Sequence, residues 1–356
     1  MVETLPIPIA ALDETETIVY INRTMEATFG SLLGMPWTFL CGDAEGGDRN
    51  ALSVLMRGER AGRAEAVLAD VTYDMLFSSV TDDAGRRHTV VMLEDVSEKR
   101  YLESRLKQNV EKIKNETGVA KHIQNSILPI DDEYWKTVRI SSIYLPADDL
   151  GGDVFDVVRL NEGETLFYIA DVSGHGIQAS LLTMFLREKV RAKKDVADRG
   201  LDALLREILT GFLALDIDAM FYLSILLCKY DKPRAELSIA NAGHNCFPLV
   251  IRQGGRVEEI PVKGMPISRI SDETDYEEEI IGMKPGDRVI LYTDGLIEEY
   301  SKTEKRAFGS EGVRRVAERL FDREGQALAK AIVAEASAYA QGAAKDDRTI
   351  IVADLL

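Results

Sequence analysis

The sequence has few of the residues that hold zinc or form disulfides. Its 356 residues include three cysteines and four histidines, and these are not spaced as the ligands of a zinc site are. An odd number of cysteines also argues against a disulfide framework. Cys228 lies in an apolar stretch, which favours a place in the core over a role as nucleophile. The sequence therefore favours chemistry by other side chains.

An excess of positive charge and a long apolar run are also missing. Lysine and arginine number 43 against 60 aspartates and glutamates, and the formal net charge is −17. Such a chain is not expected to bind nucleic acid or an anionic membrane. No apolar run approaches the roughly 18 residues of a membrane-spanning helix, and the first residues do not resemble a secretion signal. We expect a cytoplasmic protein with no membrane segment.

The length and composition predict more than one folded domain. Hydrophobic residues make up 46% of the chain and charged residues 29%, which is typical of globular proteins. Residues 1–96 have the pattern of strands and short helices, residues 97–125 that of one helix, and residues 126–356 that of strands with helices inserted among them. This order predicts an α+β fold with layers of helices and sheets.

Two motifs mark the first of these segments. In LDETETIVYINRTMEATFG a β-branched strand runs into Asn22 and a helix, and EDVSEKRYLESRL follows the last strand. Residues 71–80 and 88–93 are expected to form two strands joined by a turn. With these features residues 1–96 resemble a PAS sensor domain, which implies that they detect a signal. No histidine is placed to hold haem, and Cys41 lacks the flanking pattern of flavin-photoreactive PAS domains, so the ligand is unknown.

Residues 97–125 contain no proline and are expected to form one helix. Apolar residues follow each other at helical spacing and define a stripe: Leu102, Leu106, Val110 and Ile113. Two interpretations remain open. The stripe packs on the helix's own domain, or it forms a parallel coiled-coil linker between two copies, which would make the protein a homodimer. Pro129 ends the segment.

A carboxylate stands at each end of a predicted hairpin in the third segment. The strand in TLFYIADVSGHG ends at Asp171 and is followed by a glycine-rich turn, while Asp153 begins the preceding strand. A four-residue loop, 161–164, is expected to join the two strands. Counting from this loop places Asp153 opposite Val172, one step from Asp171. Facing residues of paired strands are close, so both carboxylates should reach one end of the sheet.

Further aspartates stand at the ends of two other predicted strands. Asp294 follows VILYT, and Asp346 and Asp347 precede TIIVA. One such aspartate is ordinarily a solvated strand end, but four such positions in one segment are less easily explained in that way. Clustered carboxylates raise each other's pKa unless a cation neutralises them, and Mg²⁺ and Mn²⁺ prefer oxygen ligands. The sequence therefore predicts a site for a divalent cation.

Seven segments from about residue 120 onward occur in a characteristic order: HIQNSILP, LGGDVFD, IADVSGHGIQASLL, MFYLSILL, IANAGHN, GDRVILYTDGLIEE and KDDRTIIV. In these segments the chain resembles the PPM family of metal-dependent serine/threonine protein phosphatases (type 2C), in its bacterial SpoIIE/RsbU-like branch. The resemblance implies a PPM-type β-sandwich flanked by helices and a site for two Mn²⁺ or Mg²⁺ ions.

The resemblance also implies roles for individual residues. Asp171 would bridge the two ions, and with Asp153 it would position the attacking water. The implied ligands are Asp153, Asp171, the backbone carbonyl of Val172, Asp294 and Asp346. Asp347 remains an alternative to Asp346, and Asp156 and His175 are secondary candidates. Asp156 should face away from Asp153 and act through hydrogen bonds, and His175 and His244 are expected to be structural.

The resemblance further implies a substrate and a partner. The substrate would be phosphoserine or phosphothreonine on a small STAS-type anti-anti-sigma protein, which would place the enzyme in a partner-switching stress response that regulates a sigma factor. A different interpretation is an inactive phosphatase-like scaffold that sequesters a partner protein. All four ligand aspartates are present, and this favours the enzyme.

Overall fold

The computed structural model describes residues 2–40, 61–68, 71–174, 176–192, 199–270, 275–301, 305–339 and 346–356. The chain divides into two compact units, Met1–Ile113 and Lys114–Leu356. The boundary falls inside helix α3 (Ser97–Ile127), so that this helix contributes residues to both units. No helix in the described ranges is long and apolar enough to cross a membrane.

The first unit is built on a five-stranded antiparallel sheet in the order β2-β1-β5-β4-β3. Its elements are η1 (Val2–Thr4), β1 (Ile9–Leu12), β2 (Ile18–Ile21), α1 (Arg23–Phe29), η2 (Trp37–Phe39), β3 (Ala61–Leu68), β4 (Val71–Thr81) and β5 (Arg87–Asp95). The expected strand pair at 71–80 and 88–93 is confirmed as β4 and β5. Asn22 caps the N-terminus of α1, where its side chain accepts a hydrogen bond from the backbone N–H of Met25.

The apolar stripe of α3 does not pack on the described part of the first unit. Leu102, Leu106, Val110 and Ile113 are all more than half exposed, and Leu106 reaches 65%. Of the two interpretations of this stripe, packing on the helix's own domain is therefore wrong in the described structure. The expected helix itself is confirmed, and it runs two residues further than the sequence indicated.

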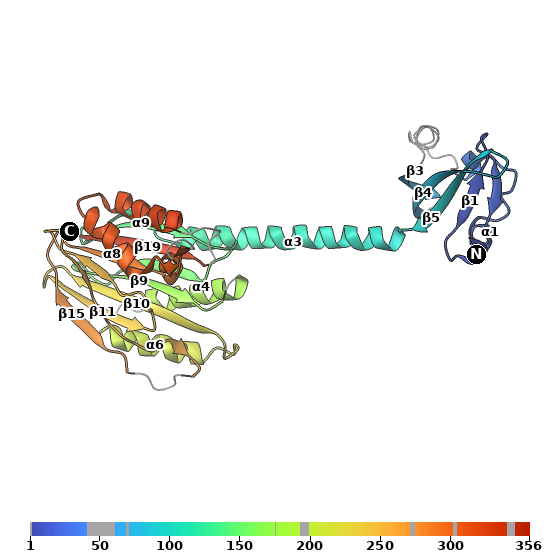
Figure 1. Cartoon of the computed structure of the whole chain (residues 1–356). Coiled ribbons are helices and arrows are strands. Elements are labelled where there is room, and N and C mark those ends of the chain that lie inside the picture. The colour runs from blue at the N-terminus through green and yellow to red at the C-terminus, as the bar shows by residue number, and fades with distance from the viewer. Residues whose placement is uncertain are drawn as a thin grey trace. The chain divides into compact units, whose positions relative to one another are not determined.

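The second unit is a sandwich of two sheets with helices on both outer faces (Figure 1). One sheet has the order β15-β11-β10-β9-β8, with β14 paired to β10, and the other has the order β13-β12-β16-β19-β7-β6. The strands of the first sheet are β8 (Asp153–Arg159), β9 (Glu164–Val172), β10 (Tyr222–Asp231), β11 (Glu236–Ala242), β14 (Ile267–Ser268) and β15 (Glu278–Gly282). Those of the second are β6 (Asp132–Tyr134), β7 (Val138–Leu145), β12 (Leu249–Ile251), β13 (Val257–Glu259), β16 (Arg288–Tyr292) and β19 (Arg348–Leu355). The predicted α+β sandwich is confirmed for this unit.

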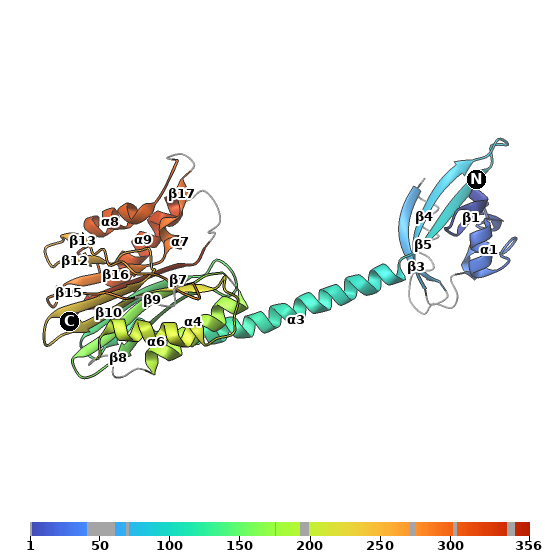
Figure 2. The ribbon, with the colours of Figure 1, turned by 90° about the horizontal axis from the view of Figure 1, so that it is seen from below.

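Each outer face of the sandwich is covered by its own helices. α4 (Ile177–Arg191) and α6 (Leu201–Leu213) pack on the first sheet, while α8 (Gly309–Arg319) and α9 (Gly325–Tyr339) pack on the second, as Figure 2 shows. A short helix α7 (Asp294–Ile297) and the pair β17 (Tyr300–Ser301) and β18 (Arg306–Ala307) follow β16. An apolar core that includes Phe155, Phe167 and Leu291 fills the space between the two sheets.

The register of the β8–β9 hairpin differs from the prediction by one residue. Asp153 pairs directly with Asp171, not with Val172. The loop is shorter than expected, because the backbone N–H of Leu160 already donates to Glu164. Asn161 closes the turn, since its side chain accepts hydrogen bonds from the backbone of Gly163 and Glu164. This register places the two carboxylates opposite each other on neighbouring strands.

Candidate active site

Asp153 is buried at the edge of the sandwich and joins its two sheets. Its Oδ2 accepts a hydrogen bond from Thr293 Oγ1 at 2.8 Å and another from Thr349 Oγ1. Asp153 begins β8 in one sheet, whereas Thr293 follows β16 and Thr349 lies in β19 of the other. No sequence pattern marks these two threonines as part of the site, apart from their position near Asp294 and Asp347. They hold the Asp153 carboxylate in a fixed orientation.

The carboxylates at this edge are close enough to affect each other's ionisation. Burial, followed by the charges of Asp294 and Asp346, raises the pKa of Asp171 to about 7. Burial and the charge of Asp171 raise the pKa of Asp153 well above its ordinary value. Burial also raises the pKa of Asp346, and the charge of Asp294 adds to this effect. Four of the predicted ligand residues therefore lie close together: Asp153, Asp171, Asp294 and Asp346. Their negative charges repel each other when all four are ionised.

Two glycines let the backbone approach this place closely. A β-carbon on Gly152 would lie 2.6 Å from the carbonyl oxygen of Val172 and 3.4 Å from Asp171 Oδ1. A β-carbon on Gly295 would lie 2.1 Å from the carbonyl oxygen of Asp347 and 3.1 Å from Asp346 Cβ. Real β-carbons do not come so near to backbone atoms, so only glycine fits at either position. The glycines bring the Val172 carbonyl toward β8 and Asp346 toward Asp294.

Asp346 and Asp347 have different surroundings, which the sequence could not separate. The carboxylate of Asp347 accepts hydrogen bonds from the backbone N–H groups of Ala147 at 2.8 Å, Gly152 at 2.6 Å and Asp153 at 3.3 Å. Asp346 accepts one, from the backbone of Asp347 at 2.8 Å. Asp347 is thus engaged in holding the chain that leads into β8. The carboxylate oxygens of Asp346 accept fewer hydrogen bonds than those of Asp347, and this favours Asp346 as the cation ligand.

We expect different effects on stability when each of these two charges is removed in the absence of metal. Asp347→Asn should lower the free energy of unfolding by about 1–3 kcal/mol, because one of its acceptor oxygens becomes an amide that faces buried N–H groups. Asp346→Asn should leave stability equal or slightly higher, because it relieves repulsion from Asp294. Urea denaturation in a chelator measures both, and the same sign for the two variants would contradict this assignment.

The oxygen atoms at this edge suit a hard divalent cation, although the described side chains are not arranged in coordination geometry. Within the described ranges, no three aspartate, glutamate, histidine or cysteine side chains form a group that could already hold a metal ion. The atoms gathered here are carboxylate and carbonyl oxygens, which Mg²⁺ and Mn²⁺ prefer. A cation would also offset the repulsion that raises the pKa of Asp171. The residues present therefore fit such an ion.

Asp156 faces the opposite side of the sheet from Asp153 and is bound by helix α4. It is completely buried, and its carboxylate accepts a hydrogen bond from Arg191 Nη2 at 2.8 Å and pairs with Arg187 Nε at 3.2 Å. The expected orientation is found, but its hydrogen bonds go to α4 and not to the other carboxylates. Asp156 fixes the helix that follows the turn after Asp171.

Removing Arg191 should therefore weaken the packing of α4. We expect Arg191→Met to lower the free energy of unfolding by about 1–3 kcal/mol, because a buried carboxylate loses one of its two charged partners. Arg139→Met is the matched control, since Arg139 and its partner Glu133 are both exposed and such pairs contribute little. Urea denaturation compares the two, and an equal effect would contradict the assignment.

The remaining candidates are structural or lie outside the described residues. His175 belongs to the part of the chain that is not described. His244 is buried, its Nε2 donates to the carbonyl of Tyr292 at 2.9 Å, and burial lowers its pKa, which keeps the ring neutral. Its Nδ1 lies 3.3 Å from Ser224 Oγ, and Ser224 pairs with Asp171 across β9 and β10. Cys228 lies in the core between the sheets, where burial raises its pKa.

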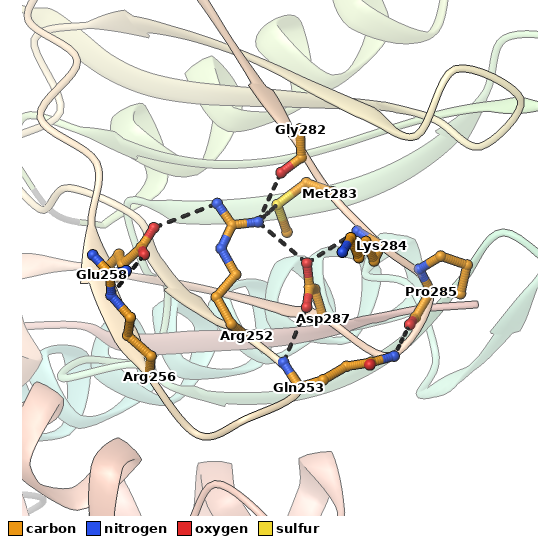
Figure 3. A network of polar contacts seen from close by, with 9 residues as sticks. All are labelled: Arg252, Gln253, Arg256, Glu258, Gly282, Met283, Lys284, Pro285 and Asp287. Carbon is orange, nitrogen blue, oxygen red and sulfur yellow. Dashed lines mark hydrogen bonds and ion pairs between the residues drawn. The ribbon is translucent and has the colours of Figure 1, made fainter.

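A second polar network lies at the opposite end of β16 (Figure 3). It borders a cavity of about 560 Å³. The guanidinium of Arg252 donates to the carbonyl of Gly282 at 2.7 Å and to Asp287 at 3.2 Å, and it reaches Glu258 at 3.4 Å. Asp287 also accepts hydrogen bonds from the backbone of Gln253 and Lys284. These bonds tie together the β12–β13 and β15–β16 connections, and the network is explained by that structural role.

Comparison with known proteins gives a consistent result for the second unit. The family model of stage II sporulation protein E (SpoIIE) matches residues 161–356. Phosphoserine phosphatase RsbU of Bacillus subtilis is 23% identical over 188 residues, which cover 53% of this chain and 55% of RsbU. Phosphoserine phosphatase RsbP of the same organism is 26% identical over 198 residues, which cover 52% of this chain and 46% of RsbP. The chain thus spans about half the length of the curated relatives it matches.

A solved structure shares the fold. The PP2C domain of SiaA from Pseudomonas aeruginosa superposes with a TM-score of 0.59 at 25% identity, over 68% of this chain and 97% of that domain. The matched share corresponds in size to the second unit. Its sandwich is therefore of the PP2C type.

Proposed function

This chain belongs to the SpoIIE family, and we propose that it is a metal-dependent phosphatase that removes phosphate from phosphoserine or phosphothreonine in a protein. One observation carries this proposal. Asp153 and Asp171 pair directly across β8 and β9, and the charges of Asp294 and Asp346 act on Asp171 at the same edge. Without a cation, such a group of carboxylates is destabilised by repulsion between like charges. With divalent cations bound, it can hold the ions that activate a water molecule.

Residues of this chain would hold two ions, either Mn²⁺ or Mg²⁺. Asp171 would bridge them, and the other ligands would be Asp153, the carbonyl of Val172, Asp294 and Asp346. Two bound ions supply an activated water and offset charge on the phosphoryl oxygens. Thr293 and Thr349 orient Asp153, and Asp347 holds the backbone of Gly152 and Asp153. His244 serves this arrangement as a neutral structural group.

The proposed substrate is a phosphorylated STAS-domain protein in a partner-switching stress response that regulates a sigma factor. The names of the relatives RsbU and RsbP, both phosphoserine phosphatases, support the chemical class of the substrate. The test is release of inorganic phosphate from a phosphorylated STAS-type protein by the full chain with Mn²⁺, with a chelator as control. An inactive scaffold would bind that protein and release no phosphate, and this outcome would overturn the proposal.

We further propose three parts for the chain: a PAS-like sensor domain at residues 1–96, a helical linker at 97–125 and the phosphatase domain at 126–356. The five-stranded order of the first sheet and the length of α3 support this division. The low number of cysteines supports a place in the cytoplasm.

The exposed stripe of α3 supports a homodimer. We expect the wild type to sediment as a dimer and the double variant Leu106→Glu, Ile113→Glu to sediment as a monomer, because both side chains are more than 60% exposed in one chain and charge there opposes pairing. Gln108→Glu, an exposed change between these two positions, is the control. A monomeric wild type at micromolar concentration would contradict the proposed dimer.

A further inference from the structure

Gln124 is a buried amide on a helix whose neighbouring side chains are exposed. It lies in the segment HIQNSILP near the end of α3 and is 3% exposed, whereas Ile123 is 46% exposed and Asn125 is also exposed. The proposed phosphatase chemistry gives Gln124 no role. A buried polar side chain needs hydrogen-bond partners, and its partners indicate what it does.

Both ends of the Gln124 amide bind the same residue. Nε2 donates to the carbonyl oxygen of Gly151 at 2.8 Å, and the backbone N–H of Gly151 donates to Oε1 at 3.3 Å. Such a pair requires a donor and an acceptor on one side chain. Glutamate could accept but not donate, and methionine, which has a similar length, has no donor and only a weak acceptor in its sulfur. The contact is therefore specific to an amide.

Gly151 stands two residues before Asp153 and is enclosed from the other side. A β-carbon on Gly151 would lie 2.3 Å from Tyr144 Oη and 2.5 Å from Asp347 Oδ2. The same Oδ2 accepts the hydrogen bond of the next residue, Gly152. The chain that leads into β8 is thus fixed between α3 on one side and Asp347 on the other.

We propose that Gln124 is a positioning residue that ties the last turns of α3 to the chain before Asp153 and so sets the place of the Asp153 carboxylate. The inference rests on the proposed function of the Asp153 site. A displacement of about 1 Å that separates Gln124 from Gly151 breaks both hydrogen bonds, because each donor–acceptor distance, 2.8 and 3.3 Å, would then exceed the usual limit. A shift or rotation of α3 therefore acts on the start of β8 directly. Since α3 contributes to both compact units, it offers a route by which the first unit can regulate the site.

The test uses the full chain with Gln124→Met, which removes both hydrogen bonds, and Asn125→Met, which makes the same kind of change on the exposed side of the same turn. In a chelator, we expect amide hydrogen exchange in residues 150–156 to be about tenfold faster in Gln124→Met than in the wild type. Asn125→Met should leave this exchange unchanged. Equal exchange at residues 150–156 in Gln124→Met and the wild type would overturn the inference.

Metal binding separates positioning from a merely structural role. We expect calorimetry to show Mn²⁺ binding weakened about tenfold in Gln124→Met. At saturating Mn²⁺ the rate of ester hydrolysis should return to that of the wild type, because the filled site then holds Asp153 in place. A lower rate at saturation with unchanged Mn²⁺ affinity would overturn the inference.

Two further outcomes keep the proposals distinct. If the wild type hydrolyses no phosphate ester while Gln124→Met loosens residues 150–156, the proposed function fails and the link between α3 and β8 stands. If Gln124→Met does not fold, Gln124→Glu carries the same exchange measurement, because it keeps the acceptor for the Gly151 N–H and loses only the donor. Unchanged exchange in that folded variant would equally overturn the inference.

Discussion

Asp171→Asn is expected to lower manganese-dependent hydrolysis of a chromogenic phosphate ester by at least about a hundredfold, in the range found when one electrostatic group of an active site is removed. Asparagine has nearly the same shape, so the loss would come from the missing charge. Asp171 faces Asp153 and feels the charges of Asp294 and Asp346, so its carboxylate is the one best placed to bridge two ions. The rate at saturating Mn²⁺ is the measurement.

Asp132→Asn provides the control for this experiment. Asp132 is an exposed residue of β6 in the second sheet, and its charge has no part in the site. This variant should hydrolyse the ester at the rate of the wild type. Equal rates in the wild type and Asp171→Asn would contradict the metal mechanism, whatever the effect on stability.

Without divalent cations, the stability of the wild type is expected to fall by a few kcal/mol as the pH rises from about 4 to about 7. The pKa of Asp171 is about 7 in the folded chain against a reference value of 3.8. Between these values the folded state binds the proton that the unfolded state has released, so the contribution of Asp171 to stability is greatest below pH 4 and is lost as the pH rises to about 7. Asp153, whose pKa is also raised, acts in the same direction. Urea denaturation in a chelator at a series of pH values measures this.

Two changes should remove this loss of stability. At pH 8, Mn²⁺ at one hundred times its dissociation constant should add about 2.7 kcal/mol to the wild type. In a chelator at the same pH, Asp171→Asn should be more stable than the wild type and should gain less from Mn²⁺. A wild type that becomes more stable between pH 5 and pH 8 without metal would show that the carboxylates do not repel each other as described.

The parts of the site that could be predicted are those that follow from strand ends. Asp171 and Asp294 stand at the ends of runs of buried apolar residues, each a short distance before a glycine, and Asp153 comes before such a run. Strand patterns are local, so the sequence places each carboxylate at an edge of a sheet. The hairpin adds one pairing, because its loop is short enough to count across.

The parts that could not be predicted depend on contacts between distant residues or on one side chain in a turn. Thr293 and Thr349 reach Asp153 across 140 and 196 residues, and no local pattern marks that meeting. Gln124 was visible only as one letter of a motif, since its partner lies 27 residues away. The register was wrong by one residue because the Asn161 side chain closes the loop early. Asp346 and Asp347 are neighbours in sequence, and they are distinguished by the hydrogen bonds that their carboxylates accept in the folded chain.

The direction of the strands has a practical consequence. β19 starts beside Asp346 and Asp347, and its last residue, Leu355, exchanges backbone hydrogen bonds with Gly286 and Asp287, next to the network around Arg252. The candidate site and residue 356 therefore lie at opposite ends of the same strand. A fluorescent reporter or a surface anchor joined after Leu356 would leave the carboxylate edge open to a protein as large as the proposed substrate. Assays on immobilised enzyme can be built on that end of the sandwich.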